Sequence, residues 1–268
     1  MTTSPAEELP GLVVVVPTRY VDLNDLRYSL ALECCQEAVV QQIPMIVVDN
    51  SPDPNVRQAL AKAGRGTTTT SKSWVTVLHY TQGRKGAALR EGIRFANEEM
   101  LKDNPGFIGF QEPEKIDMLR HWKGMAKHMQ AKRIDICVAN RKDEIFRLTY
   151  PIEQYHSENF ANLHLNAVAA QNGFPSTLDW TSGPIMFHSK WAPTWLACNG
   201  EMWDGQMIPM IRAHYQDEAT VGAYEVDFYL PAPMKKQEEG DPEWNEKRLL
   251  QLNLLFDIVG AELRKASA

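Results

Sequence analysis

Leu12-Val-Val-Val-Val16 is a run of residues that is apolar on both faces of an extended chain. Such a run is typical of a strand buried in a parallel sheet, where helices cover both faces. Residues 45–48, Met-Ile-Val-Val, form a second run of this kind, and apolar residues at helical spacing separate the two between Leu23 and Gln41. This order of strand, helix and strand predicts a βαβ unit, and hence an α/β fold with a mainly parallel, Rossmann-like sheet.

The same alternation continues along the chain. Residues 74–80 alternate in polarity, which places their strand near a sheet edge, and residues 67–73 form a polar loop that we expect to be mobile. No internal repeat and no linker rich in Gly, Ser or Pro divides the chain, so we expect a single domain over residues 1–268. The sequence predicts further strands at 107–110, 134–139, 186–187 and 221–230, and further helices at 55–63, 86–102, 157–171, 205–215 and 246–265.

The composition excludes several classes of protein. The chain has 28 Lys and Arg residues against 34 Asp and Glu, a net charge of −6 that argues against nucleic-acid binding. Its first residues lack a signal-peptide pattern, and no apolar run approaches the ~20 residues of a membrane span. We therefore expect a cytoplasmic protein without a transmembrane segment, in which the four cysteines are free thiols.

In an open α/β sheet, ligands bind beyond the carboxyl ends of the strands. Cations at a helix start suit a phosphate, and two neighbouring carboxylates suit a divalent cation. Both features follow predicted strands here. The segments after the first four strands are Pro17-Thr18-Arg19, Asp49-Asn50-Ser51, Gln82-Gly83-Arg84-Lys85-Gly86 and Gln111-Glu112-Pro113-Glu114-Lys115.

These segments, together with the strands before them, resemble the nucleotide half of GT-A glycosyltransferases, especially the family-2-like group. The resemblance covers about residues 12–115. It continues more weakly through Asp179-Trp-Thr-Ser-Gly183, which is similar to the Asp-x-x-Ser-Gly stretch of polyprenyl-phosphate sugar transferases. It implies a GT-A-like single domain with a nucleotide-sugar-binding half at about residues 11–115 and a mixed acceptor-binding half at about residues 116–268.

The resemblance also implies roles for individual residues. Asp49 would hold the nucleoside, and Lys85 and Arg90 would lie toward the diphosphate. Asp204, and after it Glu201, would be the catalytic base if the enzyme inverts configuration. The residues expected to bind the nucleotide sugar are Pro17, Thr18, Arg19, Asp49, Ser51, Gly83, Lys85, Arg90 and Glu112.

The sequence departs from the family at the metal site. GT-A enzymes usually carry Asp-x-Asp after the fourth strand, whereas this chain has Glu112-Pro113-Glu114. Residues two apart in extended backbone point the same way. We therefore expect Mn²⁺ or Mg²⁺ to bind mainly through Glu114, with Glu112 as a second ligand or a partner of the sugar. In the alternative, Lys115 neutralises the pair and makes a metal dispensable.

Each of these residues also has a structural alternative. Asp49 could cap a turn, Lys85 and Arg90 could be solvated helix charges, and Asp204 could be a helix N-cap. Glu112 and Glu114 could begin the next helix. The charge run Arg141–Glu144 is expected to be a solvated loop, and Trp180, Trp191, Trp195 and Trp203 could contact a sugar or belong to the core.

The sequence thus predicts a glycosyltransferase that moves a sugar from a UDP- or GDP-sugar to a small acceptor, with a soluble acceptor favoured over a lipid phosphate. The alternatives are a polyprenyl-phosphate sugar transferase, a nucleotidyltransferase and a non-catalytic nucleotide-sugar-binding protein. The sugar, the acceptor, the stereochemical outcome and the oligomeric state are left open.

Overall fold

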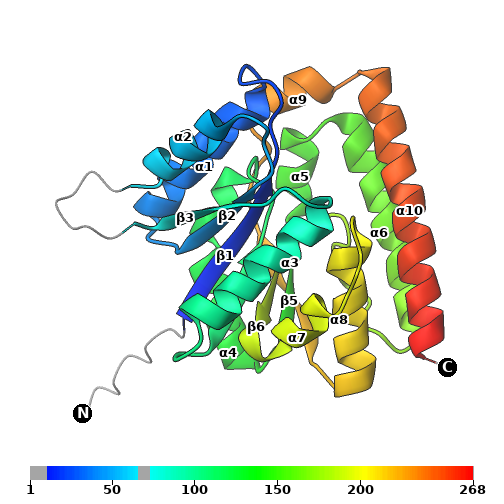
Figure 1. The fold of residues 1–268 in the computed structure, drawn as a ribbon. Helices are drawn as coiled ribbons and strands as arrows, with labels where there is room; N and C mark the ends of the chain where they lie inside the picture. The colour runs from blue at the N-terminus through cyan, green and yellow to red at the C-terminus, as the bar shows by residue number, and fades with distance from the viewer. Residues whose placement is uncertain (1–10, 66–72, 268) are drawn as a thin grey trace, which may run out of the picture.

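The computed structural model describes residues 11–65 and 73–267, whose central feature is a seven-stranded sheet (Figure 1). The strand order is β3-β2-β1-β4-β6-β5-β7, and β6 alone among these strands runs antiparallel to its neighbours. The mainly parallel sheet is therefore confirmed. The strands are β1 (Gly11–Thr18), β2 (Met45–Asp49), β3 (Val75–His79), β4 (Gly106–Phe110), β5 (Ile136–Arg141), β6 (Ile185–His188) and β7 (Val221–Val226).

Helices cover both faces of the sheet, as the apolar strands predict. Along β1, Val13 and Val15 pack into one core with α3, α6, α7, α8 and α10, whereas Val14 and Val16 pack into the other with α1, α2 and α4. The helices are α1 (Leu26–Val40), α2 (Pro54–Ala63), α3 (Lys85–Phe95), α4 (Trp122–Lys132), α5 (Asp143–Thr149), α6 (Ile152–Gln171), α7 (Ala192–Leu196), α8 (Asp204–Asp217), α9 (Ala232–Glu238) and α10 (Pro242–Ala266). Three single turns are η1 (Ala96–Met100), η2 (Ile116–Arg120) and η3 (Ser189–Trp191).

Most of the predicted elements are present, with shifted ends. The predicted helix over 86–102 is α3 followed by the π-helical turn η1, and the predicted strand over 221–230 ends at Val226. The sequence analysis did not predict α4, although Trp122, Met125, Ala126 and Met129 have helical spacing and are buried. The loop predicted over 67–73 lies, except for Ser73, outside the described residues.

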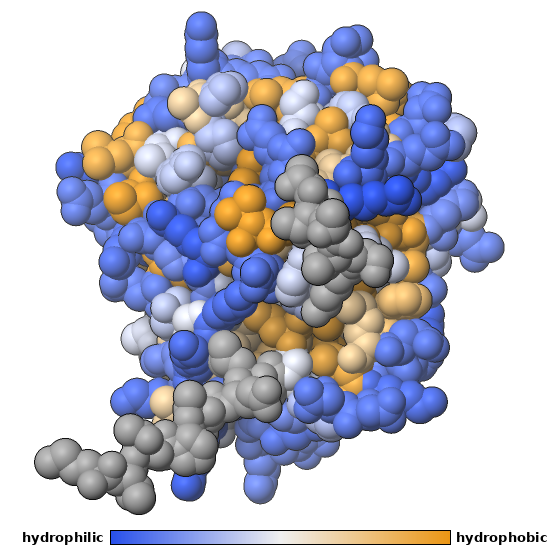
Figure 2. Space-filling view, turned by 90° about the vertical axis from the view of Figure 1, so that its left-hand side faces the viewer, coloured by the Kyte–Doolittle hydropathy of each residue, from blue (hydrophilic) through white to orange (hydrophobic). Residues whose placement is uncertain are grey.

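The edge position expected for β3 is confirmed. Figure 2 looks onto this side of the molecule, where hydrophilic side chains predominate and hydrophobic residues form smaller areas between them. Within residues 11–65 and 73–267, no helix is long and apolar enough to cross a membrane.

The strand order fixes where a ligand can bind. From β1 the chain proceeds to β2 and β3 on one side and returns to β4 on the other, so the direction of winding reverses between β1 and β4. Crevices at such switch points, beyond the carboxyl ends of the strands, are the usual ligand sites of open α/β sheets. Thr18 ends β1, and the Glu112–Lys115 turn follows β4, so both lie at this point.

Candidate functional site

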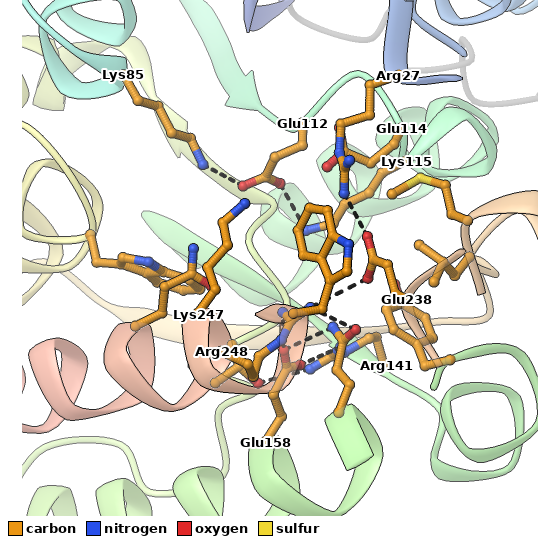
Figure 3. Close-up of a pocket in the computed structure, with 18 of the residues that line it drawn as sticks. Arg27, Lys85, Glu112, Glu114, Lys115, Arg141, Glu158, Glu238, Lys247 and Arg248 are labelled. Atoms are coloured by element: carbon orange, nitrogen blue, oxygen red, sulfur yellow. Dashed lines mark hydrogen bonds and ion pairs between the residues drawn. The ribbon is translucent and has the colours of Figure 1, made fainter. Parts of the chain in front are cut away.

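A cavity of about 210 Å³ lies next to the Glu112–Lys115 turn, between the sheet and helix α10 (Figure 3). Its walls come from α1, α3, α6, α9, α10, the end of β5 and the turn itself. Charged side chains dominate the lining. Among the described residues, its cations are Arg27, Lys85, Lys115, Arg141, Lys247 and Arg248, and its carboxylates are Glu112, Glu114, Glu158 and Glu238.

Glu112 is held between two lysines. Lys85 Nζ lies 2.5 Å from Glu112 Oε1, and Lys115 Nζ lies 2.7 Å from Glu112 Oε2, so each carboxylate oxygen faces an ammonium group (Figure 3). Burial alone would raise the pKa of Glu112, but the two lysines outweigh it and hold this pKa well below its usual range. Glu112 is therefore ionised, and both its oxygens are occupied.

Lys115 also joins this pair to the 179–183 segment. Its ammonium donates to the carbonyl oxygen of Ser182, and Gly183, with φ of +93°, passes directly over the ion pair. A Cβ at position 183 would collide with Lys115 Nζ and with Glu112 Oε2. Gly183 is thus required both by its backbone angle and by the space that the ion pair takes.

Glu114 differs from its neighbour. Among residues 11–65 and 73–267, its carboxylate makes no hydrogen bond or ion pair, although it lines the same cavity as Glu112. The expected extended backbone is wrong: Lys115 N donates to Glu112 O at 3.1 Å, which makes the segment a turn. Pro113 is compatible with either conformation, because it fixes only its own φ and biases the residue before it.

The donor set fits a divalent cation only in part. Within the described part of the chain, no group of three or more His, Cys, Asp or Glu side chains gathers around one point. Mg²⁺ commonly binds through one or two carboxylates together with substrate phosphates and water. Glu114 meets that requirement as a single protein ligand, whereas the lysines occupy both oxygens of Glu112.

Arg141 corrects the reading of residues 141–144 as a solvated loop. Its side chain is only 2% exposed and forms ion pairs with Glu158 at 2.8 Å and with Asp179 at 2.7 Å. Its guanidinium also stacks 3.6 Å from the ring centre of Phe146 on α5. Burial raises the pKa of Asp179, but Arg141 outweighs it and lowers this pKa overall. Asp179, the first residue of the Asp-x-x-Ser-Gly stretch, therefore anchors the wall of the cavity.

Asp49 lies at the end of β2, as expected, but outside the cavity lining. It is fully buried and accepts hydrogen bonds from Thr18 Oγ1 at 2.9 Å and Ser51 Oγ at 2.6 Å. Arg57 Nη1 lies 3.6 Å from its other oxygen. These partners join three of the predicted residues in one cluster at the carboxyl ends of β1 and β2. Pro17 is half-buried beside this cluster, and Arg19 is exposed.

Glu201 and Arg90 form a second cluster at the start of α3. Arg90 Nη2 donates to Glu201 Oε1 at 2.7 Å, and the backbone N–H of Arg84 donates to Oε2 at 2.7 Å. These bonds lower the pKa of Glu201, the backbone bond from Arg84 contributing most. Gly83 and Gly86 pack against the same loop, and a Cβ at Gly86 would collide with Gly200 O. Glu201 thus fastens α3 to the loop before α8.

Asp204 begins α8, and its carboxylate is engaged locally. Asp204 Oδ1 accepts from the backbone N–H groups of Met202 at 2.7 Å and Gly205 at 3.0 Å. Like a helix N-cap, Asp204 thus accepts hydrogen bonds from backbone N–H groups at the start of α8. Its neighbours Trp203 and Gln206 line the cavity, but Asp204 itself does not.

Of the four tryptophans considered from the sequence, Trp180, Trp191 and Trp195 lie in or against the core, and Trp203 lines the cavity. Trp180 and Trp195 are fully buried, and Trp195 stacks on Phe187 with ring centres 3.9 Å apart. Trp203 and Trp244 line the cavity. The sequence analysis did not single out Arg27, Glu158, Glu238, Lys247 or Arg248, whose only signal is a place on amphipathic helices.

Comparisons with known proteins agree with this fold. No family model matches the sequence, and no curated protein is significantly similar to it. Solved structures of glucosyl-3-phosphoglycerate synthase from Mycobacterium tuberculosis are similar in fold. The complex with Mn²⁺, UDP and phosphoglyceric acid is 13% identical, with a TM-score of 0.54 over 97% of this chain and 79% of the other.

Two further complexes of that enzyme give similar values. The complex with Mn²⁺, UDP-glucose and phosphoglyceric acid is 14% identical, with a TM-score of 0.52 over 96% of this chain and 80% of the other. The complex with Mg²⁺ and UDP is 12% identical, with a TM-score of 0.50 over 93% and 80%. At such low identity the likeness is one of fold, which by itself does not establish activity. The resemblance to GT-A glycosyltransferases is therefore confirmed at the level of the fold, and this chain has a GT-A-like fold.

Proposed function

We propose that the protein is a glycosyltransferase that moves a sugar from a nucleoside-diphosphate sugar to a small acceptor. The observation that carries this proposal is the charged cavity beside the β1–β4 switch point, where Lys85, Lys115 and Glu114 converge. The glycosyltransferase with the similar fold was solved with UDP-glucose and Mn²⁺, which supports a donor of this class. We propose a UDP- or GDP-sugar as the donor.

The nucleoside would lie at the carboxyl ends of β1 and β2. There Asp49, Thr18 and Ser51 form a rigid cluster, with Pro17 and exposed Arg19 at its edge. Because Asp49 is buried and already bonded, its part in this proposal includes shaping the strand ends as well as meeting the nucleoside. Gly83 and Arg90 would shape the start of α3 through their contacts with the 200–201 loop.

The diphosphate would lie between this cluster and the cavity. Lys85 is the first residue of α3, so its ammonium and the positive end of the helix dipole carry charge of the same sign, while the N–H groups of Arg84 and Gly86 donate to Glu201. Glu112 holds Lys85 in place, and the diphosphate would share that ammonium with it. Cations fixed in advance around a leaving group stabilise the charge that develops as the sugar departs.

A divalent cation fits this arrangement through Glu114. When bound, Mn²⁺ or Mg²⁺ would neutralise part of the diphosphate charge. Glu114 would hold the ion, and Glu112 would act through Lys85 and Lys115 rather than as a second ligand. Neither Asp204 nor Glu201 is proposed as the base, because hydrogen bonds engage Asp204 Oδ1 and both oxygens of Glu201.

The decisive experiment incubates the purified protein with UDP-, GDP- and TDP-sugars and a panel of small hydroxylated acceptors, with Mn²⁺ or EDTA, and measures release of the nucleoside diphosphate. We expect turnover of at least one donor, loss of it in EDTA and recovery with Mn²⁺ or Mg²⁺. Formation of a nucleoside triphosphate and a sugar 1-phosphate when pyrophosphate is added to the NDP-sugar would instead indicate a nucleotidyltransferase. Donor binding without turnover in any condition would indicate a binding protein and overturn the proposed activity.

A further inference from the structure

The charged residues around the cavity are almost all paired with one another. Lys85 and Lys115 pair with Glu112, Arg27 pairs with Glu238 at 2.5 Å, and the guanidinium groups of Arg141 and Arg248 share Glu158. Among the charged side chains of the lining that the structure describes, Glu114 and Lys247 are left without an ion pair. No ion pair joins these two.

Lys247 lies on α10 and extends into the cavity (Figure 3). Its ammonium lies 4.1 Å from the ring centre of Trp244, and the guanidinium carbon of Arg27 lies 4.5 Å from the same ring centre. The Trp244 ring thus makes cation–π contacts with both Arg27 and Lys247, of which Arg27 alone has a carboxylate partner among the described residues. An indole face gives a cation partial stabilisation and leaves its hydrogen-bond donors free.

The electrostatic surroundings of Lys247 favour an incoming anion. Partial burial lowers the pKa of its ammonium, and so do the guanidinium groups of Arg27 and Arg248, whereas Glu238 and Glu114 act in the opposite direction. The lining holds six cationic side chains against four carboxylates among the described residues, and Asp179 behind the wall is a further partner of Arg141. On α10, Arg248 pairs with Glu158 and Glu238, so Lys247 is the lining cation that these carboxylates leave without an ion pair.

We propose that the acceptor carries an anionic group, a phosphate monoester or a carboxylate, and that Lys247, positioned over Trp244 and next to Arg27, binds it. This inference rests on the proposed function and adds the chemical class of the acceptor. Lys85 and Lys115 are already bound to Glu112 beside the switch point, which leaves Lys247 for a second ligand. A cavity of about 210 Å³ is below the roughly 300–1,000 Å³ of sites for drug-sized ligands, which also indicates a small acceptor.

The test is calorimetric titration of the full chain with a charge series of small hydroxylated probes: glycerol 3-phosphate, glycerate and glycerol. We expect the two anions to bind and glycerol not to bind. Lys247→Gln should weaken phosphate binding about tenfold or more, because a charge-assisted hydrogen bond is lost. Lys265→Gln, a change at an exposed lysine of the same helix, should have no effect.

A parallel titration with UDP and GDP separates this acceptor site from the donor site. Lys247→Gln should leave nucleotide affinity within about twofold, because in the proposed donor site Lys85 and Lys115, not Lys247, face the diphosphate. Equal loss for nucleotide and phosphate would assign Lys247 to the donor and overturn the inference. It would equally be overturned if no anionic probe bound, if glycerol bound as well as its phosphate, or if Lys247→Gln changed nothing.

The two proposals fail in different ways. If no nucleotide sugar is bound or turned over, but glycerol 3-phosphate binds in a Lys247-dependent manner, the glycosyltransferase function falls and the anion site stands. If donor turnover is present and phosphate binding does not depend on Lys247, the reverse holds.

Discussion

Glu112 and Glu114 are two residues apart and line one cavity, yet their environments are opposite. Glu112 is paired through both oxygens, whereas Glu114 has no hydrogen bond or ion pair with the described residues. A charge that makes no contacts in the free protein contributes little to its stability, and a charge that satisfies two others contributes more. We therefore expect a substitution of Glu114 to affect turnover and a substitution of Glu112 to affect stability.

Glu114→Gln should reduce donor turnover at least about tenfold, because the neutral amide is a far weaker ligand for a divalent cation. The melting temperature should stay close to that of the wild type. Turnover kinetics with increasing Mn²⁺, together with thermal melting, check this, and Glu246→Gln on the exposed face of α10 is the matched control. Wild-type turnover in Glu114→Gln would exclude Glu114 as the metal ligand.

Glu112→Gln should behave in the opposite way. It leaves Lys85 and Lys115 without their shared carboxylate, and we expect a loss of about 1–3 kcal/mol in the free energy of unfolding. Urea unfolding measures this loss. A variant as stable as the wild type would show that the Lys85–Glu112–Lys115 contacts do not hold the turn.

Asp49 is a case in which the structure changes an expectation. From the sequence, Asp49→Ala should weaken nucleotide binding and leave the melting temperature nearly unchanged. The carboxylate is buried, however, and Thr18 and Ser51 would lose their acceptor. We now expect a loss of about 1–3 kcal/mol in stability together with the weaker binding. Calorimetric titration with UDP or GDP and urea unfolding of the same samples measure both, and undiminished nucleotide affinity would remove Asp49 from the nucleotide site.

At the scale of elements, α3 is the helix on which the proposed donor site depends. Its first turn is fixed to the 200–201 loop by Arg90, Glu201 and the close approach of Gly86 to Gly200 O. Gly86→Ala inserts a methyl group where backbone already lies, and we expect a cost of about 1–3 kcal/mol together with weaker nucleotide binding.

Gly260→Ala is the control, since Gly260 also lies inside a helix. A Cβ there would come no closer than 3.3 Å, to the flexible end of Arg264, so alanine should be neutral or stabilising. Urea unfolding of the two variants checks the contrast. If both variants lose the same stability, the close packing at Gly86 is not the cause.

The elements themselves were largely predictable because their signals are local. The runs that became β1 and β2 and the apolar repeat of α1 each lie within one segment, so the sequence analysis found them with small errors at the ends. The helix α5 was missed because it begins inside the charge run at 141–144, where Arg141 is polar in sequence but buried among distant carboxylates.

The site was less predictable, because its contacts join residues that lie far apart in the sequence. Lys85, Glu112 and Glu114 follow strands, and the topology rule brought them together. Lys247 lies 135 residues after Glu112 on an amphipathic helix, where its charge looks like any solvated lysine. The contact between Arg90 and Glu201 likewise joins distant segments of the chain, so no local sequence pattern predicts it.

For the whole molecule, the altered pKa values predict a two-step response to acid. Burial lowers the pKa of His121 and His188 below the ordinary 6.5, so the unfolded chain takes up protons first and stability falls as the pH drops below about 6.5. The lowered pKa values of Glu112 and Asp179 add stability that is present above their ordinary values of 4.5 and 3.8 and is lost below them. Glu238, with its raised pKa, opposes this second step.

The free energy of unfolding, measured by urea titration from pH 8 to pH 3, checks this profile. Replacing both histidines by asparagine should remove the upper step, and Glu112→Gln should weaken the lower one. A flat profile down to pH 5 in the wild type would contradict the first assignment.

The glycine at 183 has a consequence for how this protein can change over evolutionary time. The space that a side chain at position 183 would fill is taken by the ion pair of Glu112 with Lys115. The three positions are therefore constrained together. A lineage that acquired alanine at 183 would have to move or lose one of the charged partners, whereas a lineage that lost the ion pair would still need glycine for the φ of +93°. Relatives of this chain that keep Glu112 and Lys115 should therefore also keep Gly183, which links the turn after β4 to a segment about seventy residues further along.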